Sequence, residues 1–156
     1  MRSAGCNLEN MQPNDARIFE TRLRVRYAET DQMGVVYHAN YLIWFEVGRV
    51  ELLREIGFDY KRMEEEQDAG VVVVEARVRY KCAARYDDEI IVKTRVANLR
   101  RSVLQFAYEL VRASDGKLLA EGETTHLITN RRLEKRTLPA DCVAALEKAA
   151  GKSRVE

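Results

Sequence analysis

The residues best able to do chemistry lie together between positions 27 and 41, in the segment YAETDQMGVVYHANY. Asp31, Gly34, His38 and Asn40 fall within ten residues of one another. Glycine adopts dihedrals that other residues avoid, so the backbone around Gly34 can approach a ligand closely. The start of a helix offers unpaired amide donors and a positive potential. A carboxylate beside such donors can act as a base or a nucleophile that faces an oxyanion site.

This segment joins a predicted strand to a predicted helix. Apolar residues alternate with arginines before it, as in a strand with one buried face: Leu23, Val25 and Tyr27. Residues 28–39 lack periodicity and indicate a loop. From Asn40 to Ile56 the apolar stripe is so broad that the helix should be enclosed on most sides. Gly57 stands where a left-handed C-terminal cap is expected.

Most of the remaining chain is predicted to form strands, at about 71–82, 90–96, 104–110 and 117–129. Residues 114–117, Ser-Asp-Gly-Lys, favour a hairpin turn. The charged segment 59–68 can form a short surface helix, and Pro139 can begin another over 141–150. A helix followed by antiparallel strands predicts an α+β domain. We expect a curved antiparallel sheet of about five strands, wrapped around one long buried helix.

The segment 27–41 resembles the signature of the 4-hydroxybenzoyl-CoA thioesterase family of hot-dog proteins. The resemblance is greatest to the branch of acyl-CoA thioesterases associated with the Tol-Pal genes. In the family an aromatic residue and a few polar ones precede Asp-x-x-Gly-x-Val-Tyr/Trp-His/Tyr-x-Asn/Ser-Tyr. This chain matches at seven positions: Asp31, Gly34, Val36, Tyr37, His38, Asn40 and Tyr41. The resemblance covers residues 20–140 and implies a hot-dog fold that hydrolyses an acyl-CoA to a carboxylic acid and free CoA.

Carried over to this chain, the resemblance assigns Asp31 as the nucleophile or general base at the thioester carbonyl. It assigns the backbone N–H of His38 to the thioester oxygen, and the imidazole to substrate binding or proton transfer. Tyr27 is expected to orient the site. Gly34, Val36 and Tyr37 are expected to contact the substrate, while Asn40 and Tyr41 support the loop and helix.

Each of these residues also has a simpler structural interpretation. An aspartate before a helix is commonly a cap or turn residue, and a single histidine is commonly structural. It is the joint pattern of Asp31 with Gly34 and His38 that favours a site. Glu46, two turns into the helix, is interpreted as a buried or interface residue, paired with Arg49. His126 has no local partner and is interpreted as structural.

Arg100, Arg101 and Ser102 occupy a tight predicted connection between two strands. Family members place basic residues here against the phosphates of CoA, and arginine suits bidentate phosphate contacts. The alternative is a solvated hairpin turn. No spacing typical of metal ligands and no phosphate-binding glycine loop is present, so CoA enters only as part of the substrate and no cofactor is expected.

Composition limits the other classes of function. The 156 residues fit one domain, with residues 1–17 as a mobile leader and 18–150 as the folded unit. A net charge of +1 gives no general attraction to nucleic acid or membranes. No apolar run is long enough for a membrane span, no secretory signal is visible, and three distant cysteines indicate reduced thiols. A cytoplasmic location is therefore expected.

The resemblance also implies a homo-oligomer, at least a dimer, with a tetramer of paired dimers expected. The subunits would complete each other's pockets with residues of the strand that begins near Val71. Three alternative functions fit the same fold: a thioesterase acting on acyl-carrier proteins, an acyl-thioester hydratase, and a non-catalytic acyl-CoA-binding module. A hydratase needs a differently placed Asp/His pair, and a sensor module predicts a missing carboxylate. The acyl group itself is left open.

Overall fold

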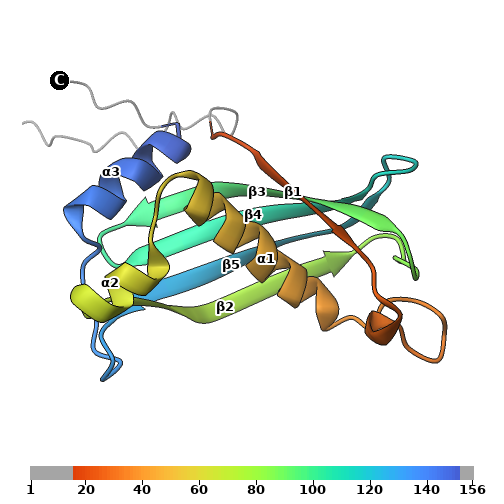
Figure 1. The fold of residues 1–156 in the computed structure, drawn as a ribbon, viewed down its shortest axis with the longest axis horizontal. Coiled ribbons are helices and arrows are strands. Elements are labelled where there is room, and N and C mark those ends of the chain that lie inside the picture. The colour runs from red at the N-terminus through yellow and green to blue at the C-terminus, as the bar shows by residue number, and fades with distance from the viewer. Residues whose placement is uncertain (1–15, 152–156) are drawn as a thin grey trace, which may run out of the picture.

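Five antiparallel strands in the order β1-β3-β4-β5-β2 form the sheet of the computed structural model, which describes residues 16–151 (Figure 1). The strands are β1 (Phe19–Arg24), β2 (Gly70–Tyr80), β3 (Glu89–Arg100), β4 (Val103–Arg112) and β5 (Leu118–Thr129). The predicted α+β class and strand number are confirmed. The chain has the hot-dog fold, in which the sheet curves around a single long helix.

That helix, α1 (Asn40–Glu55), crosses one face of the sheet. Phe45 is fully buried and stacks on Tyr108 of β4, with ring centroids 4.3 Å apart. Gly48 is required at the closest approach, because a Cβ there would collide with the side chains of Thr94 and Val92. The helix ends as predicted, with Gly57 at a φ of 80°.

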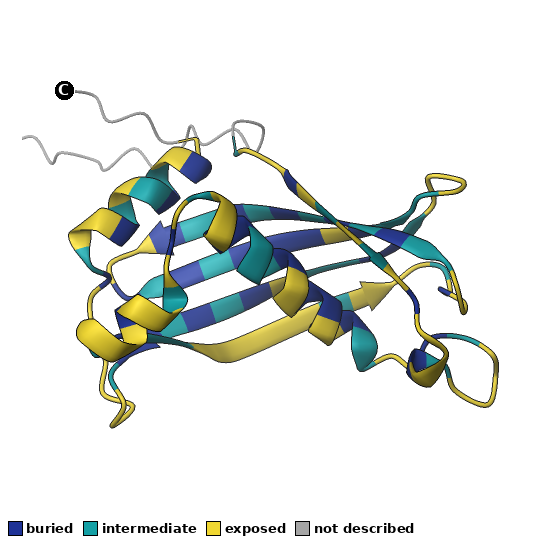
Figure 2. Cartoon of the chain, viewed as in Figure 1, coloured by how far each residue is buried: buried dark blue, intermediate teal, exposed yellow. Residues whose placement is uncertain are grey.

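The expectation that α1 is enclosed on most sides is wrong for the single chain. Leu42, Ile43 and Val47 are 40%, 51% and 37% exposed, because the sheet covers only one side of the helix. Figure 2 shows the resulting exposed stripe. Glu46 is also exposed, and within residues 16–151 it forms no ion pair with Arg49. The guanidinium of Arg49 instead donates to the Tyr108 hydroxyl at 3.4 Å.

The first strand ends earlier than predicted. β1 stops at Arg24, Val25 is buried, and a short 3-10 helix η1 (Tyr27–Glu29) follows. Tyr27 is 78% exposed, so it does not continue the buried face of the strand. The reason is a change of direction after Val25, whose N–H and C=O both pair with the 87–88 loop instead of continuing the ladder with β3.

Two short helices, α2 (Tyr60–Glu66) and α3 (Ala140–Ala149), lie at the end of the molecule opposite η1 (Figure 1). Both were predicted, and α3 begins directly after Pro139. No helix within residues 16–151 is both long and apolar enough to cross a membrane.

The predicted leader falls largely outside the described residues. Arg17, the last residue of the predicted leader, contacts the fold. Its N–H donates to the carbonyl of Ala149 at 3.0 Å, and its guanidinium lies 4.3 Å from the centre of the Phe19 ring.

β2 is an open edge of the sheet. It pairs with β5 on one side and with no other strand of the described chain on the other. Val72, Val73 and Val74 are 36%, 47% and 59% exposed, and Figure 2 shows exposure along most of the strand. A long apolar edge strand is a template for pairing with another chain.

Candidate active site

The predicted site segment folds as a short hairpin that leads into α1. Thr30 and Val36 form an isolated antiparallel bridge, and the N–H of Asp31 donates to the carbonyl of Val35 at 2.9 Å. Gly34 has a φ of 73°, which closes the turn between them in a conformation that suits glycine. The hairpin thus puts Asp31 and the start of α1 on the same exposed end of the molecule.

Asp31 combines a turn role with an exposed carboxylate. Its Oδ1 accepts a hydrogen bond from the N–H of Met33 at 2.8 Å, so the structural interpretation of this residue is correct as far as it goes. The other oxygen, Oδ2, has no hydrogen-bond partner within residues 16–151. A carboxylate fixed through one oxygen and open at the other can attack an electrophile or take a proton from water.

The N-terminal end of α1 presents free amides beside this hairpin. The carbonyl of Tyr37 accepts from Asn40 at 3.0 Å, and that of His38 accepts from Tyr41 at 3.3 Å. The N–H groups of His38 and Ala39 have no hydrogen-bond acceptor among the residues described. Such amides at the positive end of a helix dipole can hold a developing oxyanion.

Glu29 is a site residue that sequence reasoning did not single out. It is 5% exposed, and its carboxylate accepts from the indole Nε1 of Trp44 at 3.1 Å and from the N–H of Arg26 at 2.8 Å. Its carbonyl accepts from the N–H of Tyr37 and the side-chain amide of Asn40, both at 2.9 Å. Glu29 therefore ties the hairpin to α1. The available signal was a glutamate three residues after the N-cap position Arg26, as in a capping box.

The loop that follows β2 braces the hairpin from the other side. The N–H of Val36 donates to the carbonyl of Ala84 at 2.8 Å, and the N–H of Ala84 donates to the Tyr41 hydroxyl at 3.3 Å. Val36 is buried in this contact, which explains an apolar residue in the motif.

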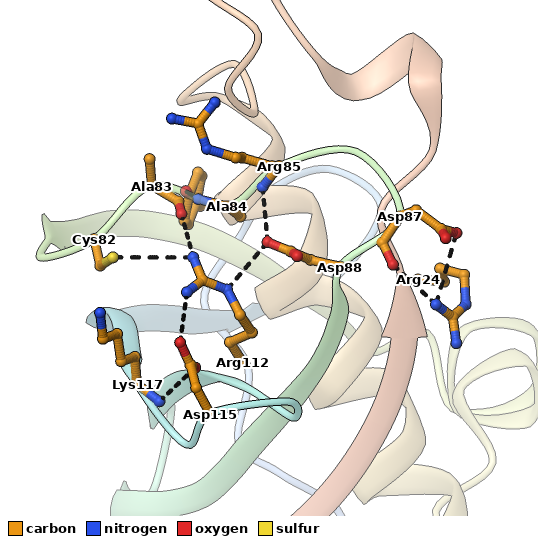
Figure 3. Close-up of polar contacts among 11 residues, drawn as sticks. Arg24, Cys82, Ala83, Ala84, Arg85, Asp87, Asp88, Arg112, Asp115 and Lys117 are labelled. Atoms are coloured by element: carbon orange, nitrogen blue, oxygen red, sulfur yellow. Dashed lines mark hydrogen bonds and ion pairs between the residues drawn. The ribbon is translucent and has the colours of Figure 1, made fainter.

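Arg112, at the end of β4, fixes that loop in turn (Figure 3). Its side chain is 15% exposed and donates to Asp88 at 3.1 Å, to Asp115 at 2.8 Å and to the carbonyl of Ala83 at 2.7 Å. Asp88 also accepts from the N–H of Arg85 at 2.9 Å. A partly buried guanidinium with three oxygen partners is a rigid support.

The aromatic residues of the motif are exposed beside it. Tyr37 is half-exposed and its ring lies 4.4 Å from that of His38. Tyr27 packs edge-on against Tyr86, with centroids 5.6 Å apart, and its hydroxyl has no partner within residues 16–151. The hairpin contacts thus bring six of the predicted residues into one region: Tyr27, Asp31, Gly34, Val36, Tyr37 and His38.

The Arg100–Ser102 turn is not part of this region in the single chain. It joins β3 to β4 at the end of the sheet near α3, where the carbonyl of Arg101 accepts from Leu138 at 3.0 Å. Arg100 and Arg101 are exposed, whereas Ser102 is only 7% exposed.

Two further features lie away from the hairpin. A groove of about 510 Å³ on the outer sheet face is lined by both basic and acidic side chains and contains none of the predicted site residues.

Inside the domain, His126 is fully buried and its Nε2 lies 2.8 Å from the Thr124 hydroxyl. Burial lowers the pKa of His126 to about 4, so the neutral ring serves as a structural group.

The chain is similar in sequence and in fold to known thioesterases. Residues 25–146 match the family model described as the thioesterase-like superfamily. A putative acyl-CoA thioesterase, YneP, of Bacillus subtilis is 35% identical over 116 residues, which is 73% of this chain and 81% of that protein. The acyl-CoA thioester hydrolase YbgC of Escherichia coli is 34% identical over 128 residues, 81% of this chain and 94% of that one. The crystal structure of a DHNA-CoA thioesterase from Staphylococcus aureus superimposes with a TM-score of 0.79 at 33% identity, over 84% of this chain and 89% of that one.

Proposed function

Because the chain belongs to the thioesterase-like superfamily, we propose that it is an acyl-CoA thioesterase, which hydrolyses an acyl-CoA to a carboxylic acid and free CoA. The observation that carries this proposal is the pairing of an open carboxylate, Asp31, with free amides at the start of α1 on one short hairpin. The named thioesterases among its relatives support the same reaction.

In the proposed reaction the thioester oxygen lies against the N–H of His38. Charge that develops on this oxygen is stabilised by the amide and the helix dipole, and removing one such donor typically lowers the rate by about 10²–10³-fold. Asp31 either attacks the carbonyl carbon and displaces the CoA thiolate, leaving an acyl-aspartyl anhydride that water then hydrolyses, or takes a proton from the attacking water and passes it to the departing thiolate. The exposed imidazole of His38 stands beside the reacting group, and CoA leaves as the thiol. The proposal requires no cofactor, since CoA is part of the substrate.

The proposal includes a second copy of the chain, paired along β2. The exposed valines of β2 and the exposed stripe of α1 that includes Leu42 and Ile43 are the surfaces such a partner would cover. An antiparallel partner strand would bring its own residues near Val71 beside the end of β2, where Tyr80 lies next to His38. Two such dimers would make the tetramer that the family resemblance implies.

This arrangement also gives the Arg100–Ser102 turn a role. A two-fold axis across β2 reverses the direction of the partner's sheet, so the turn of the second copy lies at the same end as the hairpin of the first. Its two arginines would then be available to the phosphates of CoA. We place the reaction in the cytoplasm, which agrees with the free thiols of Cys82 and Cys142.

Release of free CoA from a panel of acyl-CoAs tests the proposed function. The panel should contain aromatic, short branched and long-chain acyl groups, with matched acyl-carrier-protein thioesters in parallel. We expect saturable hydrolysis of at least one acyl-CoA. Saturable binding of acyl-CoAs without turnover would show a binding module instead, and turnover restricted to carrier-protein thioesters would move the substrate to that class.

A further inference from the structure

Tyr80, the last residue of β2, touches the turn that carries the free amides. Its hydroxyl donates to the backbone carbonyl of His38 at 3.0 Å. Its ring stands edge-on to the ring of Tyr41, with centroids 5.0 Å apart, and to the ring of His38 at 6.4 Å. None of these contacts was predicted, because β2 is far from the motif in sequence and its alternation indicates only a strand.

The hydrogen bond from Tyr80 acts on a specific peptide group. The carbonyl of His38 and the N–H of Ala39 belong to one planar peptide unit, so fixing the carbonyl also fixes the direction of that N–H. The preceding unit, which contains the N–H of His38, is fixed through the carbonyl of Tyr37 by Asn40. Hydrogen bonds to the carbonyls of their own peptide units therefore fix the directions of both free amides. The Tyr37 carbonyl accepts from Asn40, and the His38 carbonyl accepts from Tyr80 and, at a longer 3.3 Å, from the N–H of Tyr41.

Such a hydrogen bond also polarises the unit. A donor to the carbonyl makes the N–H of the same peptide a stronger donor, because hydrogen bonds in a chain strengthen one another. Desolvation raises the pKa of the Tyr80 phenol above its ordinary value, so the group keeps its proton at neutral pH and can donate.

The position of Tyr80 is itself well supported. Its strand neighbour in β5 is Ala120, and the next two residues, Lys81 and Cys82, donate their N–H groups to the carbonyl of Leu119 at 2.8 and 3.1 Å. Two residues further on, Ala84 braces Val36 and Tyr41, and Arg112 holds Ala83. The hydroxyl of Tyr80 is thus presented from a fixed frame.

We propose that Tyr80 is a positioning residue for the hydrolysis: its hydroxyl holds the His38–Ala39 peptide in the orientation that lets the start of α1 stabilise an oxyanion. This inference rests on the proposed function and extends it to a residue outside the motif. Tyr80 acts through the backbone and does not itself react.

The test is Tyr80→Phe, which deletes the hydroxyl and keeps the ring contacts. Tyr60→Phe is the matched control, since Tyr60 lies on α2 at the opposite end of α1 and its hydroxyl has no partner within residues 16–151. With the best acyl-CoA of the panel, we expect Tyr80→Phe to lower kcat about 3- to 10-fold with KM changed by less than about twofold. The control should keep both values, and both variants should keep the wild-type melting temperature within a few degrees, since neither loses a buried contact.

A second measurement reports on the hydrogen bond without requiring activity. The amide nitrogen of Ala39 lies in the affected peptide unit, so its NMR resonance should shift in Tyr80→Phe and stay in place in Tyr60→Phe. An unchanged kcat, a change confined to KM, or an unmoved Ala39 resonance would overturn the proposal. If the wild-type protein hydrolysed nothing in the panel, the proposed function would fail, and the Ala39 resonance would still decide whether Tyr80 holds this turn.

Discussion

His126 illustrates how strongly the fold acts on one side chain. It lies inside a chain of polar groups in which its Nε2 meets the hydroxyl of Thr124, which in turn meets the hydroxyl of Tyr108 at 2.7 Å. The ring of Phe106 stands edge-on to it at 5.5 Å, and the charge of Arg49 also opposes its protonation. The neutral imidazole is therefore part of the folded state, and protonation is costly there.

The buried neutral ring of His126 makes the stability of the fold depend on pH. The pKa of His126 is about 4 in the folded chain, against an ordinary value of about 6.5, so the unfolded chain takes up the proton first as the pH falls. Stability from this group is complete above about pH 6.5 and is lost progressively down to about pH 4, by on the order of 3 kcal/mol. In urea unfolding between pH 6.5 and pH 4, the free energy of unfolding should fall less steeply with decreasing pH for His126→Gln than for the wild type. An equal slope for the two proteins would contradict this role of His126.

At the scale of one element, α1 shows which parts of the structure the sequence could predict. Its bounds, its buried stripe and the Gly57 cap follow from periodicity and from the properties of glycine. Its exposed stripe does not, because periodicity counts apolar residues and does not say whether the same chain or a partner covers them. The close contact of Gly48 with β3 is likewise absent from the local sequence, since it depends on a strand more than 40 residues away.

The hairpin that carries Asp31, like α1, could be predicted from the sequence only in part. The motif identified Asp31, Gly34 and His38 as one local unit, and a loop before a helix predicted free amides. The supports of this unit come from β2, β4 and the 81–88 loop, so Tyr80, Ala84 and Arg112 could not be found by reading along the motif. Glu29 was within the motif, but its burial depends on the indole of Trp44.

Gly48→Ala tests the packing of α1 on the sheet. Alanine favours an isolated helix by about 1 kcal/mol, but the new methyl group would overlap Thr94 and Val92, and overpacking costs about 1–3 kcal/mol. We expect a net loss of stability in urea unfolding. Gly70→Ala is the control, because its Cβ would meet only the carbonyl of Thr129 at an ordinary 3.8 Å. A Gly48→Ala protein more stable than the wild type would show that α1 does not lie this close to β3.

At the scale of the whole molecule, the proposed assembly depends on the open edge of β2. A lysine on an edge strand opposes pairing with another chain, because its charge would be buried in the new sheet. Val73→Lys should therefore shift the protein toward the monomer in analytical ultracentrifugation and lower its activity in parallel.

Leu133→Lys serves as the control for that experiment. Leu133 is an exposed leucine, at 71%, in the connection after β5 and not on β2. This variant should sediment as the wild type does. An unchanged sedimentation coefficient for Val73→Lys, or full activity from a monomer, would contradict pairing along β2.

The proposed hydrolysis depends on the carboxylate of Asp31, and Asp31→Asn tests this dependence most directly. Asparagine keeps an oxygen for the N–H of Met33 and removes only the charge. Asp59→Asn is the matched control, because the Asp59 carboxylate also accepts a hydrogen bond from a nearby backbone N–H. Its donor is Arg62, at 3.0 Å, at the start of α2. We predict that kcat/KM for the best acyl-CoA falls about 10²–10⁴-fold in Asp31→Asn and stays at the wild-type value in Asp59→Asn. Full activity in Asp31→Asn would contradict the central claim.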